Sequence, residues 1–242
     1  MYKRQVYLVG VLPLVIIAFA RRGLRETRRF EETGPAKDRG LMHIWKTPHK
    51  RRVIELGAIW FLTYICTQNA ITWFKEFAVA ERGMTAGQVG LRIAIAAVVA
   101  MPLVFGVGKL LDVVGRRMGA VIVFVLGAGG AFFSYTLHSP LALTIALVFG
   151  IFGASAVLPV LNAFTTELFP TDLRGDAFAW ANNLIGRIGY VASPAIVGAI
   201  AHQVGWGPAV RWTAVFPLIA LILILRLLPE TRGRELEETA SL

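Results

Sequence analysis

An arginine in the middle of an apolar stretch offers the most specific chemistry in the sequence. Arg187 lies near the centre of residues 177–202, where a membrane helix is expected and where an arginine costs about 3 kcal/mol on translocon scales. Asn183 lies one helical turn before it and Tyr190 three residues after it, so the three side chains share a face, with Asn182 at its edge. An anionic group of a solute is the natural partner of this guanidinium. The alternative is a structural arginine bonded to backbone carbonyls or to another polar side chain.

A second polar group lies in the apolar residues 54–74. It consists of Tyr64, Gln68, Asn69 and Thr72, which form a strip among aromatic residues. Such a strip fits the lining of a solute cavity, and hydrogen bonds between helices without any ligand are the alternative. Asn162, in another apolar stretch, is a further candidate for the cavity lining.

A third group is a charged turn at residues 108–117, between two apolar stretches. It contains one acid, Asp112, then Gly115, which permits a turn with positive φ, and then the bases Arg116 and Arg117. Its charged side chains can pair with three residues of later connections: Glu167, Arg174 and Glu230. The alternative is that these bases only follow membrane topology around a tight turn.

Membrane helices must position all three groups. The chain of 242 residues is 56% hydrophobic, and soluble domains are about 45–50% apolar, so the excess must face lipid or a very large core. The candidate spans are residues 5–20, 54–74, 89–111, 118–137, 140–163, 177–202 and 209–228. The sequence therefore predicts an all-α membrane protein with seven transmembrane helices.

Charge and cysteine content exclude other classes. The formal net charge of +10 does not indicate binding to nucleic acid, because the bases lie in the short connections between apolar stretches. The one cysteine, Cys66, lies inside an apolar stretch and the four histidines are scattered, so we expect no disulfide, no metal site and no cofactor.

The distribution of bases predicts an orientation. Eleven Lys or Arg residues lie in residues 21–52, and bases return around 109–117, at Arg174 and from Arg226 onward, whereas the alternate connections carry few. We therefore expect a multi-pass protein of the cell membrane, plasma or inner, with a cytoplasmic C-terminus. The expected parts are a helix at 1–20, a basic cytoplasmic linker with a short amphipathic helix at 21–52, a six-helix domain at 53–228 and a cytoplasmic tail at 229–242.

One spacing occurs twice. Gly108-x3-Asp112-x2-Gly115 recurs as Gly198-x3-His202-x2-Gly205, each at the end of the second helix of a three-helix set. The sets are residues 54–137 and 140–228, and the two turns are expected on opposite membrane faces. This predicts a 3+3 inverted repeat, the architecture of one half of many secondary transporters.

Three motifs then resemble those of the major facilitator superfamily. Residues 108–117 are similar to its G-x3-D-x2-G-R-R loop, residues 167–175 to its E-x2-P-x3-R-G loop, and residues 228–238 to the P-E-T-x-G-x2-L-E-E tail of its sugar-porter-like and organic-ion branches. Residues 21–30 also resemble the arm that follows the sixth helix there. Val113 departs from the pattern, because the family usually has a base after the motif aspartate.

The resemblance implies a function. It implies that the charged residues form a cytoplasmic gate and that the chain belongs to a secondary transporter of a small organic solute, which works by alternating access. Arg187 and Asn183 favour an organic anion over a sugar, and a coupling proton is an additional expected partner.

The resemblance covers only helices six to twelve of twelve. Residues 1–20 would be the last helix of a missing N-terminal half, and a separate half or a second copy would supply the opposite cavity wall. Substrate in this family binds between two halves, so we expect this chain alone not to transport.

Two other function classes share some of these sequence features. A heptahelical receptor or sensor has the same number of spans but does not require the three motifs. A membrane enzyme would need an activated nucleophile, and Ser155 has no histidine within a span to activate it, so we do not expect an enzyme.

Overall fold

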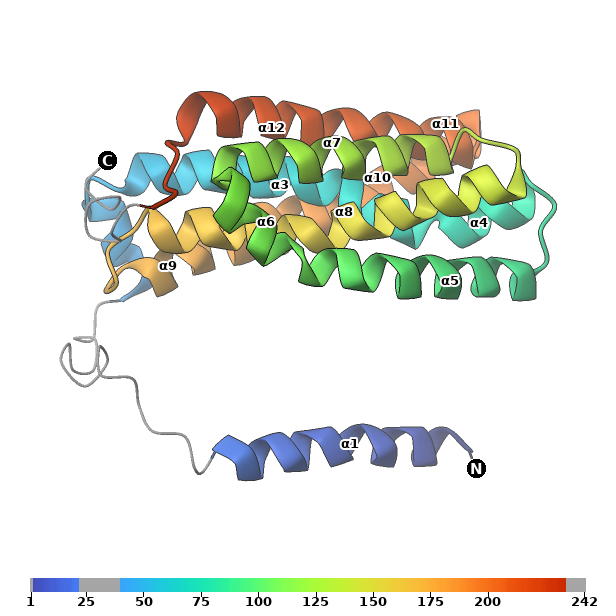
Figure 1. Ribbon diagram of the computed structural model, residues 1–242, viewed down its shortest axis with the longest axis horizontal. Helices are drawn as coiled ribbons and strands as arrows, with labels where there is room; N and C mark the ends of the chain where they lie inside the picture. The colour runs from blue at the N-terminus through green and yellow to red at the C-terminus, as the bar shows by residue number, and fades with distance from the viewer. Residues whose placement is uncertain (1, 22–39, 234–242) are drawn as a thin grey trace. The chain divides into compact units, whose positions relative to one another are not determined.

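The computed structural model describes residues 2–21 and 40–233 (Figure 1). The chain divides into two compact units, Met1–Gly40 and Leu41–Leu242. The first unit contains one described helix, α1 (Tyr2–Arg21), which includes the predicted first span. The amphipathic helix predicted in the linker and the last part of the predicted tail lie outside the described residues.

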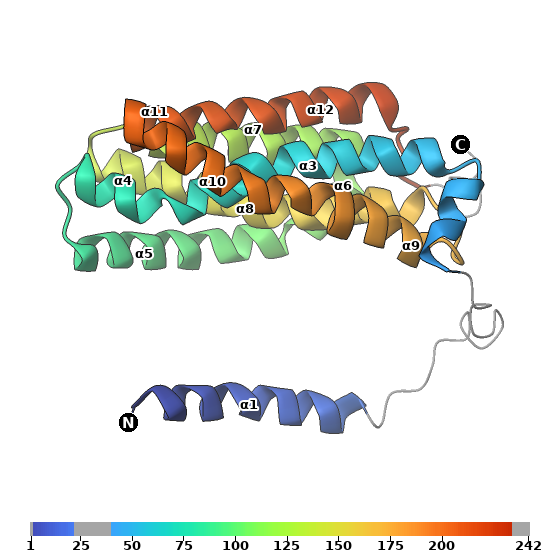
Figure 2. The ribbon, with the colours of Figure 1, turned by 180° about the vertical axis from the view of Figure 1, so that it is seen from behind.

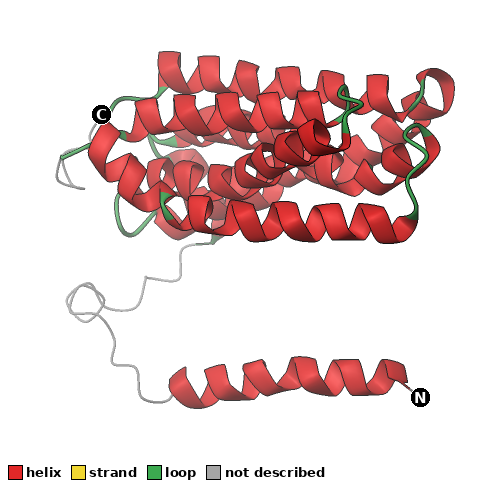
Figure 3. Cartoon of the chain, turned by 45° about the vertical axis from the view of Figure 1, so that its right-hand side comes forward, coloured by secondary structure: helices red, strands yellow, loops and turns green. Residues whose placement is uncertain are grey.

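The second unit contains the remaining described helices, and no strand occurs among the residues that the structure describes (Figure 3). In chain order they are η1 (Leu41–Lys46), α3 (Lys50–Thr72), α4 (Phe74–Ala80), α5 (Ala86–Phe105), α6 (Val107–Val114), α7 (Arg116–Ser134), α8 (Pro140–Glu167), α9 (Arg174–Phe178), η2 (Ala179–Gly186), α10 (Arg187–Val204), α11 (Trp206–Arg211), η3 (Trp212–Ala214) and α12 (Val215–Leu227). The all-helical prediction is confirmed.

Among the residues that the structure describes, five continuous helical stretches are long and apolar enough to cross a membrane. They are Ala86–Val114, Arg116–Ser134, Pro140–Glu167, Arg174–Val204 and Trp206–Leu227. α3 is not among them, because polar residues such as Glu55, Gln68 and Asn69 lower its mean hydropathy. The predicted count of seven transmembrane helices and the predicted 3+3 repeat therefore stay predictions.

α8 is the most enclosed of these stretches and the α5–α6 stretch is the least. Half of the apolar window of α8 is buried, compared with 17% of the window of Ala86–Val114. α5 presents large apolar side chains outward, for example Val98 and Phe105. The remaining half of α8 is apolar as well, as expected of a helix that meets either other helices or lipid.

Glycines bring α7 and α8 into direct backbone contact (Figures 1 and 2). A Cβ added to Gly153 would lie 2.2 Å from the Cα of Gly127, and a Cβ added to Gly130 would lie 2.2 Å from the backbone nitrogen of Gly150. Small residues at such a crossing replace side-chain packing with close contact between helix backbones. The crossing fixes the relative position of the start of α7, which carries Arg116, and the end of α8, which carries Glu167.

Candidate functional site

The segment before Arg187 is not a regular α-helix. Residues Ala179–Gly186 form the π-helix η2, which joins α9 to α10. π-Helical segments are rare and often occur at functional sites, because the wider turn changes which side chains share a face. This segment carries two of the four predicted asparagines, Asn182 and Asn183, and ends immediately before Arg187.

The π-helix places its two asparagines differently. The side chain of Asn182 is 4% exposed and faces α3, whereas Asn183 is exposed. The hydroxyl group of Tyr64 donates a hydrogen bond of 2.9 Å to Oδ1 of Asn182. Asn182 therefore bonds η2 to α3, while Asn183 stays on the outward face.

Aromatic contacts connect Tyr64 to Arg187. The ring of Tyr64 stacks on the buried Trp60 at 5.3 Å between centroids, and the edge of Tyr190 meets it at 5.4 Å. The guanidinium of Arg187 lies over the Tyr190 ring, 5.9 Å from its centroid. Asn183, Arg187 and Tyr190 are all exposed and form a polar face. Tyr190 connects this face to the buried rings of Tyr64 and Trp60.

The polar strip of α3 is mostly used within the bundle. Nδ2 of Asn69 donates to Oγ of Ser193 at 2.9 Å, and Oδ1 of Asn69 accepts from Nε1 of Trp73 at 3.0 Å. Gln68 donates to Thr72 on its own helix at 3.0 Å. Asn69 thus joins α3 to α10 at a point five residues beyond Tyr64 on α3. These contacts favour a packing role for Asn69.

Two buried polar atoms near this region have no hydrogen-bond partner among the described residues. They are Oδ1 of Asn162, on α8, and Nε1 of Trp60, on α3. A buried amide oxygen without a partner is uncommon in native proteins, so Asn162 stays a candidate for contact with a solute or with water.

A cluster of charged side chains lies at the turn between α6 and α7. Nη2 of Arg116 pairs with Oε1 of Glu167 at 2.9 Å, and Nε of the same arginine donates to both oxygens of that carboxylate. Nη1 of Arg116 also pairs with Asp112 at 2.9 Å. One guanidinium therefore joins the end of α6, the start of α7 and the end of α8.

Glu230 closes this cluster from the segment after α12. Its carboxylate accepts hydrogen bonds from the backbone N–H groups of Arg116 at 2.8 Å and Arg117 at 2.9 Å, which are free donors at the start of α7. Burial opposes ionisation of this carboxyl, but backbone donors, including Thr231 and Arg232, outweigh it and lower the pKa of Glu230. Glu230 is thus an N-terminal cap provided by a distant part of the chain.

Gly115 is required by this arrangement. Its φ is +93°, a conformation that L side chains rarely adopt, and a Cβ there would lie 2.9 Å from Oε2 of Glu230. The structure thus brings together Asp112, Gly115, Arg116, Glu167 and Glu230, as well as the main chain of Arg117.

Two predicted gate side chains bond elsewhere. Arg174 donates to the carbonyl oxygen of Phe169 at 3.0 Å, and the side chain of Arg117 donates to the carbonyl oxygen of Leu225. Sequence reasoning missed one member of the cluster, Thr231, whose hydroxyl group donates to Glu167. Its place in the P-E-T motif was the available signal.

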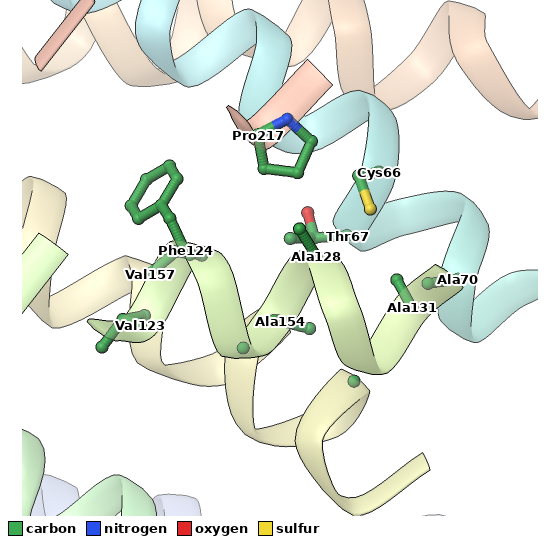
Figure 4. A pocket seen from close by; sticks show the side chains of 13 residues that line it. Cys66, Thr67, Ala70, Val123, Phe124, Ala128, Ala131, Ala154, Val157 and Pro217 are labelled. Atoms are coloured by element: carbon green, nitrogen blue, oxygen red, sulfur yellow. The ribbon is translucent and has the colours of Figure 1, made fainter. Parts of the chain in front are cut away.

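A small pocket lies between α3, α7, α8 and α12 (Figure 4). Its lining is almost entirely apolar and includes Cys66, Phe124, Val157 and Pro217, with Thr67 as a polar exception. None of the predicted solute-binding residues lines it. This pocket is therefore a packing defect beside the glycine crossing and does not carry the candidate site.

Comparison with known proteins places the chain in a family. The family model described as Major Facilitator Superfamily matches residues 5–194 and 61–241. A Bacillus subtilis protein named as a niacin/nicotinamide transporter is 25% identical over 95% of this chain and 58% of its own length. A Cupriavidus pinatubonensis protein named as a 4-methylmuconolactone transporter is 26% identical over 94% of this chain and 54% of its own length.

A solved structure shows the same fold. The proton:xylose symporter XylE, bound to 6-bromo-6-deoxy-D-glucose, superimposes with a TM-score of 0.64 at 19% identity, over 84% of this chain and 44% of that chain. The chain thus spans a little over half the length of these two curated relatives. The resemblance seen in the three motifs is confirmed, and the chain belongs to the major facilitator superfamily, a family of membrane transporters and not of enzymes.

Proposed function

We propose that the chain forms the C-terminal half of a secondary transporter for a small organic anion, which works by alternating access. The observation that carries this proposal is the exposed face of Asn183, Arg187 and Tyr190 halfway along the Arg174–Val204 stretch. An exposed arginine at that depth is costly in lipid, and a water-filled cavity with an anionic solute removes the cost. The names of the two relatives, which refer to small organic metabolites, support this substrate class.

The opposite wall of the cavity is part of the proposal. Substrate in transporters of this kind binds between two halves at mid-membrane, and we infer that a second half or a second copy faces α5 and α10. The outward apolar side chains of both helices support a partner in that position. Proteoliposomes that contain only this chain are then expected to show no uptake, and robust uptake would contradict the need for a second wall.

The cytoplasmic gate is proposed for the cluster around Arg116. Partly buried ion pairs suit such a role, because they can bias two conformations that differ by a few kcal/mol. Most of the bases of this unit lie at the same end as this cluster, which supports a cytoplasmic position for it and for the C-terminus. A cysteine introduced at Lys109 should then react with a membrane-impermeant thiol reagent only from the cytoplasmic side.

The substrate proposal is tested by Arg187→Gln. The variant is measured in native membrane vesicles, where any second chain is also present, with a panel of labelled nicotinate, benzoate and xylose. We expect uptake of the two carboxylates to fall at least about tenfold, since a hydrogen bond between charged groups contributes about 1.5–3 kcal/mol.

Lys75→Gln, on α4, is the matched control, because it removes one exposed positive charge outside the candidate site and the gate cluster. It should leave uptake unchanged. Unchanged carboxylate uptake in Arg187→Gln would remove Arg187 from the site, and loss of xylose uptake alone would replace the anion with a sugar as the substrate class.

A further inference from the structure

Two turns of the second unit have the same backbone conformation. Gly115, between α6 and α7, has φ 93° and ψ 163°, and Gly205, between α10 and α11, has φ 87° and ψ 161°. Each glycine ends one helix, donating to the carbonyl four residues earlier, and directly precedes the next helix. The turns lie at opposite ends of the bundle (Figures 1 and 2).

Each turn is also covered by a glutamate from a distant segment. At the first turn Glu230 accepts from the backbone N–H groups of Arg116 and Arg117. At the second turn Oε1 of Glu81, 126 residues earlier in the chain, accepts from the backbone N–H group of Gly207 at 3.0 Å. Glu81 is the C-cap residue of α4, and its backbone N–H group donates to the carbonyl oxygen of Phe77.

The second turn has no room for side chains beneath this carboxylate. A Cβ on Gly205 would lie 3.0 Å from Oε1 of Glu81, and a Cβ on Gly207 would lie 2.8 Å from Oε2. The same relation holds at the first turn, where a Cβ on Gly115 would lie 2.9 Å from Oε2 of Glu230. Both carboxylates are therefore seated directly on a glycine turn.

The residue after Glu81 extends this contact to a third helix. Nε of Arg82 donates to the carbonyl oxygen of Leu137 at 3.1 Å, and Nη2 donates to that of Thr136 at 3.2 Å. Its guanidinium also lies 4.6 Å from the centroid of the Phe77 ring. The pair Glu81–Arg82 thus connects the end of α4 to the start of α11 and to the connection that follows α7.

We propose that Glu81 is the positioning residue of a second gate, on the membrane face opposite to Glu230. It acts through the α10–α11 turn, and Arg82 anchors it to the connection between α7 and α8. The inference rests on the proposed transport function, since two gates on opposite faces must be released in alternation during alternating access. It also gives a structural basis to the predicted repeat, because the repeated spacing at Gly108–Gly115 and Gly198–Gly205 ends in two turns of the same backbone conformation, each capped by a glutamate.

A charge-assisted cap suits this role. Carboxylate bonds to the free N–H groups at a helix start are about twice as strong as neutral hydrogen bonds, yet a partly exposed carboxylate is released without moving a buried core. The exposed position of Glu81 and the short connection that carries it meet this condition.

The first measurement tests the contact itself and needs no solute. Hydrogen–deuterium exchange is measured on the full chain in lipid nanodiscs for Glu81→Leu, Glu81→Gln and Glu230→Leu. We expect Glu81→Leu to speed exchange in residues 206–209 about tenfold and to leave 116–119 unchanged, and Glu230→Leu to do the reverse. Glu81→Gln should give a smaller effect, because the amide oxygen still accepts a hydrogen bond.

The second measurement tests the gate. A reporter cysteine replaces the exposed Ile188, with the buried Cys66 changed to alanine, and its labelling is followed in native membrane vesicles of both orientations. We expect Glu81→Leu to raise labelling at least about threefold from the Glu81 side and Glu230→Leu to raise it from the opposite side. Lys75→Gln, which removes an exposed charge from α4, should change neither.

Labelling that changes on the same side for both glutamate variants, or on neither side, would overturn the second gate. Exchange that rises equally at both ends would show that Glu81 only stabilises the fold, which also overturns it. If Glu81→Leu does not fold, the same hydrogen–deuterium exchange and cysteine-labelling measurements on Glu81→Gln test the proposal. None of these results depends on the Arg187 experiment, so failure of the substrate proposal remains distinguishable.

Discussion

Arg116 and Glu167 lie 51 residues apart in the sequence and form an ion pair of 2.9 Å in which both side chains are largely shielded, with 18% and 13% of their surface exposed. The pair joins the start of α7 to the end of α8, at the end of the bundle opposite to Glu81. The glycine crossing lies further along the same two helices. The burial of the pair distinguishes it from the bond of Arg116 to Asp112, whose side chain is 72% exposed.

Removal of this pair should destabilise the fold far more than removal of its exposed neighbour. In a double-mutant cycle of Arg116→Gln and Glu167→Gln we expect a coupling energy of about 1–3 kcal/mol, and for Asp112→Asn a cost below about 0.5 kcal/mol. Thermal and denaturant unfolding in detergent measure both. A coupling energy between Arg116 and Glu167 below about 0.5 kcal/mol, as small as the expected cost of Asp112→Asn, would show that the pair does not stabilise the fold.

The capped turn at Glu230 predicts a pH dependence of stability. Its native pKa lies below the ordinary value of 4.5, so the ionised form is favoured by folding. This contribution is fully present above the ordinary pKa and is lost as pH falls through the lowered native pKa. The melting temperature of the wild type should therefore fall below that pH more steeply than that of Glu230→Gln. Parallel profiles for the two proteins would contradict this assignment.

The glycine crossing of α7 and α8 offers a matched pair of substitutions. Gly153→Ala should destabilise the protein by about 3 kcal/mol or more, because its Cβ would meet the Cα of Gly127 at 2.2 Å and force the helices apart. Gly129→Ala, on the same helix as Gly127, meets nothing within 4 Å and should be neutral or slightly stabilising. Unfolding curves of the two variants decide this, and equal costs would mean that helix propensity dominates over close contact.

The bond between Tyr64 and Asn182 should be detectable without a ligand. Tyr64→Phe keeps the ring contacts but leaves the buried amide oxygen of Asn182 unsatisfied, which costs about 1–3 kcal/mol. Combining it with Asn182→Leu, which removes that oxygen, should recover part of the loss. If the double variant loses the full sum of the two single costs, the hydroxyl and the amide do not act as a pair.

The sequence alone determined the features that depend on local properties. Apolar stretches predicted helices, because a helix that crosses lipid must satisfy its backbone internally and present apolar side chains. The acid, the glycine and the bases at 108–117 predicted a charged turn, and the structure places Asp112, Gly115, Arg116, Glu167 and Glu230 in one cluster.

The tertiary structure alone decided which of two adjacent asparagines is buried in the bundle and which is exposed. A regular helix places Asn183, Arg187 and Tyr190 on one face with Asn182 at its edge, but the π-helix over Ala179–Gly186 sends Asn182 into the bundle to Tyr64. A change of helical register depends on packing against α3, where a Cβ on Gly186 would meet Trp60 at 2.7 Å. Likewise, Glu81 and Gly207 are far apart in sequence, and no local pattern predicts that one caps the other, because their contact exists only once α4 and α11 are packed together.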